Sequence, residues 1–235
     1  MSDDIRIYHG DCLEILNTIS PSCIDLLVTD PPYKTICGGD SGDRPKGMLS
    51  GNRKLFTHQT DIAFSDWMPL VYRVLKEGSH AYIFTNSMNL KDMLVEAENV
   101  GFKLHNILVW EKNNCTPSQF YMKNCEYVLF LRKGKAKWIN NIGASKTVHQ
   151  CNNIIGMKTH PCEKPVDLLR FYIENSSKEG ETVLDPFMGT CSCGEACLLS
   201  RRKFVGIEKD ETFFKIAWNR MEKGNGNGIQ VELFS

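Results

Sequence analysis

The chain lacks a hydrophobic run long enough to cross a membrane, and it carries no net charge. Its 235 residues include 28 Lys and Arg against 28 Asp and Glu, and its first residues, Ser2, Asp3 and Asp4, are polar and acidic. A signal peptide begins instead with a basic segment that leads into an apolar one. We therefore expect a soluble, cytoplasmic protein with no membrane partner, whose attraction to nucleic acid depends on where its basic residues lie.

The chain also lacks the paired C-x2-C spacing of a structural zinc site, although it contains 10 cysteines. The nearest groupings are His149 with Cys151, His160 with Cys162, and Cys191 with Cys193 and Cys197. Without an export signal, reduced thiols that pack in or near the core are expected, and no metal is predicted. G-x-G-x-x-G and the Walker lysine are absent too, which makes a dinucleotide or a nucleoside triphosphate a weak expectation.

Apolar runs of strand length alternate with segments of helical periodicity. Strands are predicted at residues 5–8, 24–29, 80–85, 104–110, 127–131, 182–184 and 204–207, and helices at 12–17, 67–75, around 93–97, 165–173, around 196–200 and after 210. Ser65 is the expected N-cap of the helix at 67–75, and Gly78 is expected just past its end. No element is predicted over 132–159, and the Gly-rich link at 224–228 leads to a short apolar tail. This alternation favours a single α/β domain over residues 1–235, with a sheet that grows by crossover connections.

The most informative motif is Asp30-Pro31-Pro32-Tyr33, which follows the apolar run at 24–29 directly. Open α/β sheets bind their ligands at the carboxyl ends of the strands. Two consecutive prolines restrict how the Asp30 carboxylate, the Pro31 carbonyl and the Tyr33 ring are arranged. The motif is therefore predicted to grip a planar amine, although Asp-Pro-Pro also serves simply to end a strand.

A second polar tip follows the predicted strand at 182–184 and runs from Asp185 to Gly194. Its glycines, Gly189 and Gly194, allow a backbone to pass close to a ligand, and the helix start offers free amide groups. The next strand ends at Glu208, where a carboxylate can accept hydrogen bonds from two ribose hydroxyls. These features predict a nucleoside-containing ligand.

Taken in order, Asp30-Pro31-Pro32-Tyr33, His160-Pro161-Cys162-Glu163-Lys164-Pro165 and Asp185-Pro186-Phe187-Met188-Gly189 resemble the motifs of the β-class DNA amino-methyltransferases that use S-adenosylmethionine. The similarity covers nearly the whole chain. It implies a Rossmann-like methyltransferase fold with a mixed, mostly parallel sheet, helices on both faces, and a circularly permuted order in which the catalytic motif precedes the cofactor motif. The family usually has Gly where Cys191 stands and Thr where Ser192 stands, and we expect Cys191 to pack rather than to narrow the cofactor pocket.

The resemblance also implies the site residues. Asp30, Pro31, Pro32 and Tyr33 are the expected catalytic residues. Cofactor contacts are expected from Asp11, Cys12, Asp30, His160, Lys164, Asp185, Phe187, Gly189, Thr190, Ser192 and Glu208. Within this set, Glu208 is expected on the ribose, Asp11 near the adenine base, and Lys164 over the methionine end.

The expected reaction transfers a methyl group from S-adenosylmethionine to the N6 amine of an adenine flipped out of double-stranded DNA. Asp rather than Ser at the start of the motif favours adenine over the N4 amine of cytosine, which is the main alternative. Acceptors at Asp30 and Pro31 bind the amino hydrogens and stabilise the developing positive charge, while Tyr33 stacks on the base. The resemblance leaves open a homodimer and a cognate restriction endonuclease as partners.

Basic residues cluster in two places that are candidates for phosphate contacts. The first cluster contains Lys34, Arg44, Lys46, Arg53 and Lys54, and the second contains Arg132, Lys133, Lys135 and Lys137. Target recognition is expected from the segments at 34–65, 113–123 and 133–159. Their amide side chains, such as Gln119, Asn140 and Asn141, suit adenine edges.

Two other functions fit parts of the sequence. Pro161-Cys162 and Glu98-Asn99-Val100 are of the kinds that cytosine-C5 methyltransferases use, but their order along the chain is wrong for that mechanism. A catalytically idle nucleic-acid-binding protein on the same scaffold would not need both Asp30-Pro31-Pro32-Tyr33 and Glu208.

Overall fold

A computed structural model describes residues 4–33, 62–116, 121–154, 163–225 and 229–233. The strands are β1 (Ile5–His9), β2 (Ile24–Thr29), β3 (Leu75–Thr85), β4 (Phe102–Thr116), β5 (Lys123–Lys133), β6 (Val148–Gln150), β7 (Thr182–Asp185), β8 (Lys203–Glu208) and β9 (Ile229–Leu233). The helices are α1 (Cys12–Thr18), α3 (Phe64–Val74), α4 (Leu90–Val100), α5 (Val166–Ser176), α6 (Ser192–Leu199) and α7 (Glu211–Asn225).

The strands form a single sheet in the order β6-β4-β5-β3-β2-β7-β8-β1-β9. The pairings of β2 with β3 and β7, of β8 with β7 and β1, and of β4 with β6 are all parallel. The described strands include one reversed member, β5, which pairs antiparallel with both β3 and β4. The predicted mixed, mostly parallel sheet is confirmed. The expectation of crossover growth fails at β4 and β5, which follow each other as antiparallel neighbours.

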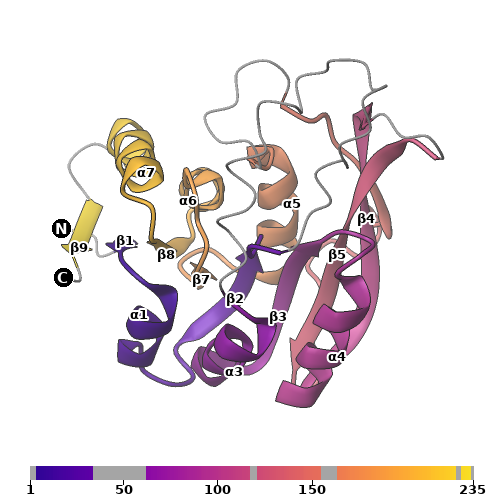
Figure 1. The fold of residues 1–235 in the computed structure, drawn as a ribbon, viewed down its shortest axis with the longest axis horizontal. Helices are drawn as coiled ribbons and strands as arrows, with labels where there is room; N and C mark the ends of the chain where they lie inside the picture. Colours follow the sequence, from indigo (N-terminus) through magenta and orange to yellow (C-terminus); the bar gives the residue numbers. More distant parts are fainter. Residues whose placement is uncertain (1–3, 34–61, 117–120, 155–162, 226–228, 234–235) are drawn as a thin grey trace, which may run out of the picture.

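Helices cover both faces of the sheet (Figure 1), and side chains alternate between two cores along each strand. Leu26 and Val28 of β2 pack with α5, α6 and α7 in one core. Leu27, between them, packs with α1, α3 and α4 in the other core. Strands buried on both faces read as the continuous apolar runs seen in the sequence.

Several element boundaries differ from those predicted. The N-cap of α3 is Ala63, and Ser65 lies inside the helix, because the Asp66 carboxylate accepts the Ala63 amide at 2.9 Å. Gly78 lies within β3 at a φ of +78°, since β3 begins directly after α3. Helix α6 begins at Ser192, earlier than residue 196.

Two strands, β6 and β9, are not among those predicted from the sequence. β6 forms inside the stretch at 132–159 and joins the edge of the sheet beside β4. The apolar tail forms β9, which adds to the opposite edge by pairing in parallel with β1. Both strands are short and sit at sheet edges, where one neighbour rather than two supplies the hydrogen bonds and the apolar signal in the sequence is weak.

Among the described residues, no helix is both long and apolar enough to span a membrane.

Candidate active site

The two predicted motifs meet at one edge of the sheet. β2 and β7 are parallel neighbours with Leu27 opposite Leu184, so Asp30 follows β2 beside the end of β7 at Asp185. The Thr29 hydroxyl donates to Oδ1 of Asp185 at 2.7 Å. The motif that begins at Asp30 and the loop that begins at Asp185 therefore lie together at the carboxyl ends of the parallel strands, which we call the carboxyl edge.

Glu208 and Asp11 extend this row of acidic tips. Glu208 ends β8 opposite His9 of β1, and Asp11 follows β1. One carboxylate oxygen of Glu208 accepts the Gly189 amide at 3.0 Å and the other accepts the Asp210 amide at 2.7 Å. Asp11 caps α1 by accepting the Leu13 amide at 2.9 Å, and its other oxygen pairs with the Lys209 ammonium at 2.9 Å.

The loop after β7 is shaped to let a ligand approach. Gly189 has a φ of +54°, which favours glycine, and a Cβ there would meet no described atom within 4 Å. The side chain of Cys12, at the start of α1, is buried, and burial raises the pKa of its thiol to about 12. Phe187 packs edge-on against Trp67 with ring centroids 5.4 Å apart, which anchors the loop on the side of α3.

Asp185 is buried, with 6% of its surface exposed. Burial raises its pKa to about 7, and the hydrogen bonds from Thr29 and from the Phe187 amide only partly oppose this. The carboxylates of Asp30 and Glu208 add to the rise. Three acidic groups thus concentrate negative charge at one edge, and such a site favours a ligand that brings positive charge.

Asp30 belongs to a chain of alternating charges. The Lys164 ammonium donates to Oδ2 of Asp30 and lies 3.3 Å from Oε2 of Glu126. The Lys112 ammonium pairs with the other oxygen of Glu126. Burial and the nearby Glu126 carboxylate raise the pKa of Asp30, although Lys164 opposes the rise.

The remaining residues of the catalytic motif follow Asp30 along the chain beyond the end of β2. Pro31 is buried, whereas Pro32 and Tyr33 are half-buried. Tyr33 packs against the core that contains α1 and α3. The motif thus runs outward from a buried strand end, with its ring at the boundary of the core.

Arg220 of α7 forms hydrogen bonds with Thr190 and Ser192, which are predicted to lie near the cofactor. The Arg220 guanidinium donates to the Thr190 carbonyl at 3.0 Å and to the Ser192 hydroxyl at 2.7 Å. It also pairs with the buried Glu163. Glu163 and Lys164 therefore bind opposite halves of the site, since Glu163 joins the cofactor loop and Lys164 joins Asp30.

Cys191 packs, as expected. It is fully buried in the core on the side of α5, α6 and α7. Its φ of +66° lies in the left-handed region, where glycine is favoured over other residues. This backbone conformation would suit the glycine that the family resemblance implies at this position.

Several predicted residues fall in parts of the chain that the structure does not describe. They are Lys34, Arg44, Lys46, Arg53, Lys54, Gln119, His160 and Cys162. Glu98 is exposed on α4, away from Asp30. The cytosine-C5 mechanism gains no support from this placement.

The second basic cluster lies at the edge of the sheet formed by the amino ends of the parallel strands, which we call the amino edge. β5 runs antiparallel to β3, so Arg132 pairs with His80 and Lys133 lies toward the amino end of β3. The Lys133 ammonium donates to the carbonyls of Tyr72 and Leu75, each at 2.7 Å, and the Lys135 amide bonds to Glu77 at 3.1 Å. We therefore leave Arg132, Lys133 and Lys135 out of the proposed DNA contacts.

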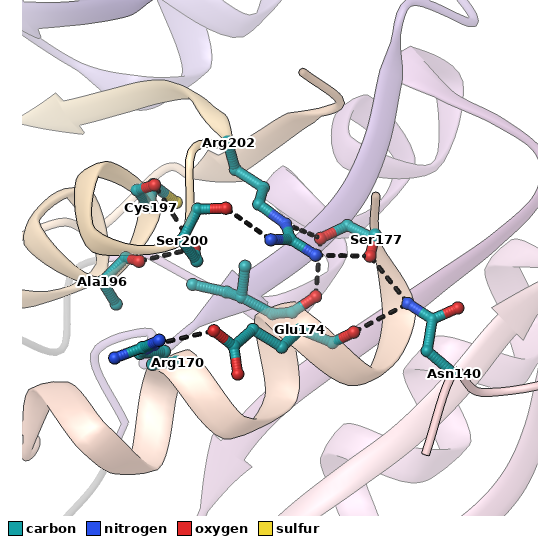
Figure 2. A network of polar contacts seen from close by, with 9 residues as sticks. Asn140, Arg170, Glu174, Ser177, Ala196, Cys197, Ser200 and Arg202 are labelled. Carbon is teal, nitrogen blue, oxygen red and sulfur yellow. Dashed lines mark hydrogen bonds and ion pairs between the residues drawn. The ribbon is translucent and has the colours of Figure 1, made fainter. Parts of the chain in front are cut away.

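Asn140 is also used structurally. Its side-chain amide donates to the carbonyls of Glu174 and Ser177 at 2.7 and 2.8 Å, at the end of α5 (Figure 2). That end of α5 lies at the amino edge of the sheet, because β7 starts there. Asn140 does not belong to the edge that carries Asp30.

A family model described as "DNA methylase" matches residues 24–219, which include the tips at Asp30, Asp185 and Glu208. The chain belongs to this family. Its members methylate exocyclic amino groups of DNA bases, at adenine N6 or cytosine N4, and S-adenosylmethionine is the methyl donor.

Related proteins match over nearly the whole chain. It is 28% identical to the type II methyltransferase M2.DpnII of Streptococcus pneumoniae, covering 93% of this chain and 90% of that protein. It is 28% identical to the type II methyltransferase M.HinfI of Haemophilus influenzae, covering 97% of this chain and 71% of that one.

Two solved structures show the same fold. M1.HpyAVI in complex with SAM superimposes with a TM-score of 0.69 at 24% identity, covering 92% of this chain and 99% of that one. The cytosine-N4-specific PvuII DNA methyltransferase superimposes with a TM-score of 0.71 at 18% identity, covering 98% and 96%. The predicted methyltransferase fold is confirmed.

The site contains residues that the sequence did not single out. Glu126, Lys112, Glu163 and Arg220 hold Lys164 and the cofactor loop through the contacts above. Glu163 was visible within the motif that contains Lys164, but nothing in its spacing indicated a role. Glu126 stands near the start of a strand, whereas the sequence patterns of α/β sheets point to residues at strand ends.

Proposed function

We propose that this chain methylates the N6 amine of an adenine that is flipped out of double-stranded DNA. One observation carries the proposal. Oδ1 of Asp30 is buried at the carboxyl edge, and among the described residues it has no hydrogen-bond partner. A buried acceptor without a donor is costly, and an exocyclic amine would supply that donor.

The chain's own residues account for the chemistry as follows. The Asp30 carboxylate and the Pro31 carbonyl accept the two amino hydrogens, which draws the nitrogen lone pair out of conjugation with the ring. Tyr33 stacks on the base and sets the line of attack. Asp30 stabilises the positive charge that develops on nitrogen and then accepts the proton that the nitrogen releases.

S-adenosylmethionine supplies a methyl group on a positively charged sulfonium. The residues present suit this donor, because Gly189 leaves open space in the loop and the carboxylates of Asp185 and Glu208 concentrate negative charge nearby. We propose that Glu208 binds the ribose hydroxyls, that Asp11 and Cys12 lie by the adenine base, and that Asp185, Phe187, Gly189, Thr190 and Ser192 form the loop under the methionine part. We assign Lys164 to Asp30 instead of the methionine end, because it is bonded there.

The preference for adenine rests on Asp30 at the start of the motif. Digestion of methylated DNA to nucleosides, followed by mass spectrometry, tests it directly. N6-methyl-2′-deoxyadenosine is the expected product, and N4-methyl-2′-deoxycytidine would overturn this assignment while leaving the methyltransferase activity in place.

The described start of the predicted recognition segment, residues 113–116, lies toward the same edge as Asp30, because β3 and β4 both run antiparallel to β5. Asn113 and Asn114 there accept hydrogen bonds from Asn153 at 2.9 and 3.0 Å. We propose that the segment at 113–123 reads the target sequence together with the segment at 34–65.

The substitution Asp30→Asn tests the catalytic role. It keeps the size of the side chain and removes the negative charge, so we expect methyl transfer to fall by about 100-fold or more while cofactor affinity stays within about threefold. The transfer of label from labelled cofactor to mixed-sequence DNA measures methyl transfer, and calorimetry measures cofactor affinity.

A matched control lies on the same strand. Asp25, on β2 near its amino end, accepts from Lys76 and from the Thr182 amide at 2.6 and 3.0 Å. Asp25→Asn is expected to retain methyl transfer within about twofold of wild type. Full activity in Asp30→Asn would refute the proposed mechanism.

A further inference from the structure

Lys164 lies between two carboxylates that come from different strands. Its ammonium is bonded to Oδ2 of Asp30, after β2, and lies 3.3 Å from Oε2 of Glu126, on β5. The Lys164 side chain is 7% exposed, and those of Asp30 and Glu126 are 20% and 21% exposed. In so sheltered a place the ammonium is held by these charges rather than by bulk water.

Each of these two carboxylates has one oxygen that can accept a further hydrogen bond. Oδ1 of Asp30 and Oε2 of Glu126 are both buried, and neither has a hydrogen-bond partner among the described residues. Ammonium–carboxylate hydrogen bonds measure about 2.7–2.9 Å, so Lys164 needs to move only about 0.5 Å to bond Oε2 of Glu126. The geometry thus provides a second position for the same ammonium.

Glu126 is kept ionised by its neighbours. Its other oxygen pairs with the Lys112 ammonium, which lies over the Trp110 ring at 4.7 Å from the centroid. Although burial opposes it, the positive charges of Lys164 and Lys112 hold the pKa of Glu126 below its usual range. An anion is therefore present beside Lys164 at neutral pH.

We propose that Glu126 is a positioning residue for methyl transfer, which takes up the Lys164 ammonium when the Asp30 carboxylate turns to the target amine. This inference rests on the proposed function. As the amine bonds to the methyl group it becomes cationic, and an ammonium on the same carboxylate would repel it. Moving Lys164 to Glu126 frees Asp30 to stabilise the new charge and to accept the proton.

The substitution Glu126→Gln removes the charge but keeps the shape. The anion beside Lys164 on β5 is then lost and its bond to Asp30 is strengthened, so we expect kcat to fall by about 10-fold or more with cofactor affinity within about twofold of wild type. Glu111→Gln is the matched control, because Glu111 on β4 bonds Gln150 at 2.8 Å instead. The control is expected to keep the kcat of wild type.

The pH profile separates this role from mere support of the fold. Among the described residues, Lys164, Glu126, Tyr33 and Asp185 are the titratable groups that interact with Asp30. The Glu126 charge raises the pKa of Asp30, so in Glu126→Gln the acid limb of kcat should move to lower pH, by about 0.5 pH unit or more. Glu126→Asp keeps the charge and should keep the acid limb of wild type.

A double-mutant cycle gives the decisive result. If Glu126 acts through Lys164, the variant carrying both Glu126→Gln and Lys164→Gln should have the kcat of Lys164→Gln alone, within about twofold. Multiplicative losses, or an acid limb that stays in place in Glu126→Gln, would overturn the inference. Neither result affects the proposed function, which depends on methylation by wild type and on the loss in Asp30→Asn.

Discussion

At the scale of single residues, the burial of the Asp185 carboxylate costs folding free energy at a position that we propose contributes to cofactor binding. Its carboxyl group is buried without a cation beside it among the described residues, and its pKa of about 7 lies well above the usual value of 3.8. A folded-state pKa that is raised above the unfolded value adds stability fully below the unfolded pKa, and this stability is lost as pH rises through the folded value. For Asp185 the loss falls between about pH 4 and pH 7.

We therefore expect Asp185→Asn to stabilise the cofactor-free protein at pH 8, by a few kcal/mol at most, and much less at pH 4. An amide oxygen can still accept from Thr29 and from the Phe187 amide, so the loop keeps its bonds. Urea denaturation at the two pH values measures the difference. Equal effects of the substitution at pH 4 and pH 8 would contradict the assigned burial cost.

His80 makes a second pH-dependent contribution to stability. It is fully buried on β3, and its Nδ1 lies 2.8 Å from the Ser176 hydroxyl. Burial lowers its pKa from 6.5 to about 4. A histidine whose folded-state pKa is lowered adds stability that is fully present above pH 6.5 and is lost as pH falls toward 4.

We expect His80→Gln to cost less stability at pH 5 than at pH 8, since the amide does not titrate. The contribution of His80 to the pH dependence is at most about 3 kcal/mol. Thermal unfolding of both proteins across this range measures it, and parallel curves for wild type and variant would rule it out.

At the scale of elements, the end of α5 is stabilised by side chains from outside the helix. The Arg202 guanidinium donates to the Ser177 carbonyl at 2.8 Å and to its hydroxyl at 3.1 Å, and Asn140 reaches the Glu174 and Ser177 carbonyls beside it (Figure 2). The last carbonyls of a helix have no partner within the helix, so these donors fill a structural need. α5 begins two residues after Lys164, at Val166, and its stability therefore supports the site.

Replacing Asn140 by Ala should cost about 1–2 kcal/mol in the free energy of unfolding, because the Glu174 and Ser177 carbonyls each lose a hydrogen bond from its side chain. The bases that the protein methylates should not change, since Asn140 lies at the edge away from Asp30. Asn141→Ala is the matched control, because this exposed neighbour contributes its backbone carbonyl to Ser145 and should cost little. A changed methylation pattern in Asn140→Ala would return this residue to the recognition surface.

At the scale of the whole molecule, the two edges of the sheet have different roles. The carboxyl edge carries Asp30, Asp185 and Glu208, whereas the amino edge carries Arg132, Lys133 and Lys135. An acidic site repels a polyanion such as DNA, so basic residues elsewhere in the chain must supply the attraction. We expect the basic residues of the segment at 34–65 to do so.

The salt dependence of DNA binding tests this division. Each phosphate that a basic side chain neutralises adds about 0.9 to the slope of log affinity against log salt. Removing two such charges with Arg53→Gln and Lys54→Gln should therefore make the slope shallower, whereas Lys135→Gln with Lys137→Gln should leave it unchanged. Fluorescence anisotropy with a labelled duplex at several salt concentrations measures the slope, and a shallower slope for the second pair would place DNA at the amino edge.

The sequence alone was sufficient to locate Asp30, Asp185 and Glu208 at one edge. Each follows or ends an apolar run, and in a parallel sheet such ends meet whatever the order of the strands. The open space at Gly189 follows in the same way from a glycine after a strand. The family resemblance rested on the motifs at 30–33, 160–165 and 185–189, and the family match confirmed it.

Only the tertiary structure decided the direction of β5. Its apolar pattern is the same whether it runs parallel or antiparallel, because side chains alternate across a strand in either case. Since β5 is reversed, its first residues bring Glu126 to Lys164, and its last residues take Arg132 and Lys133 to the far edge. Strand direction depends on contacts between segments far apart in the chain, and no local pattern of residues records it.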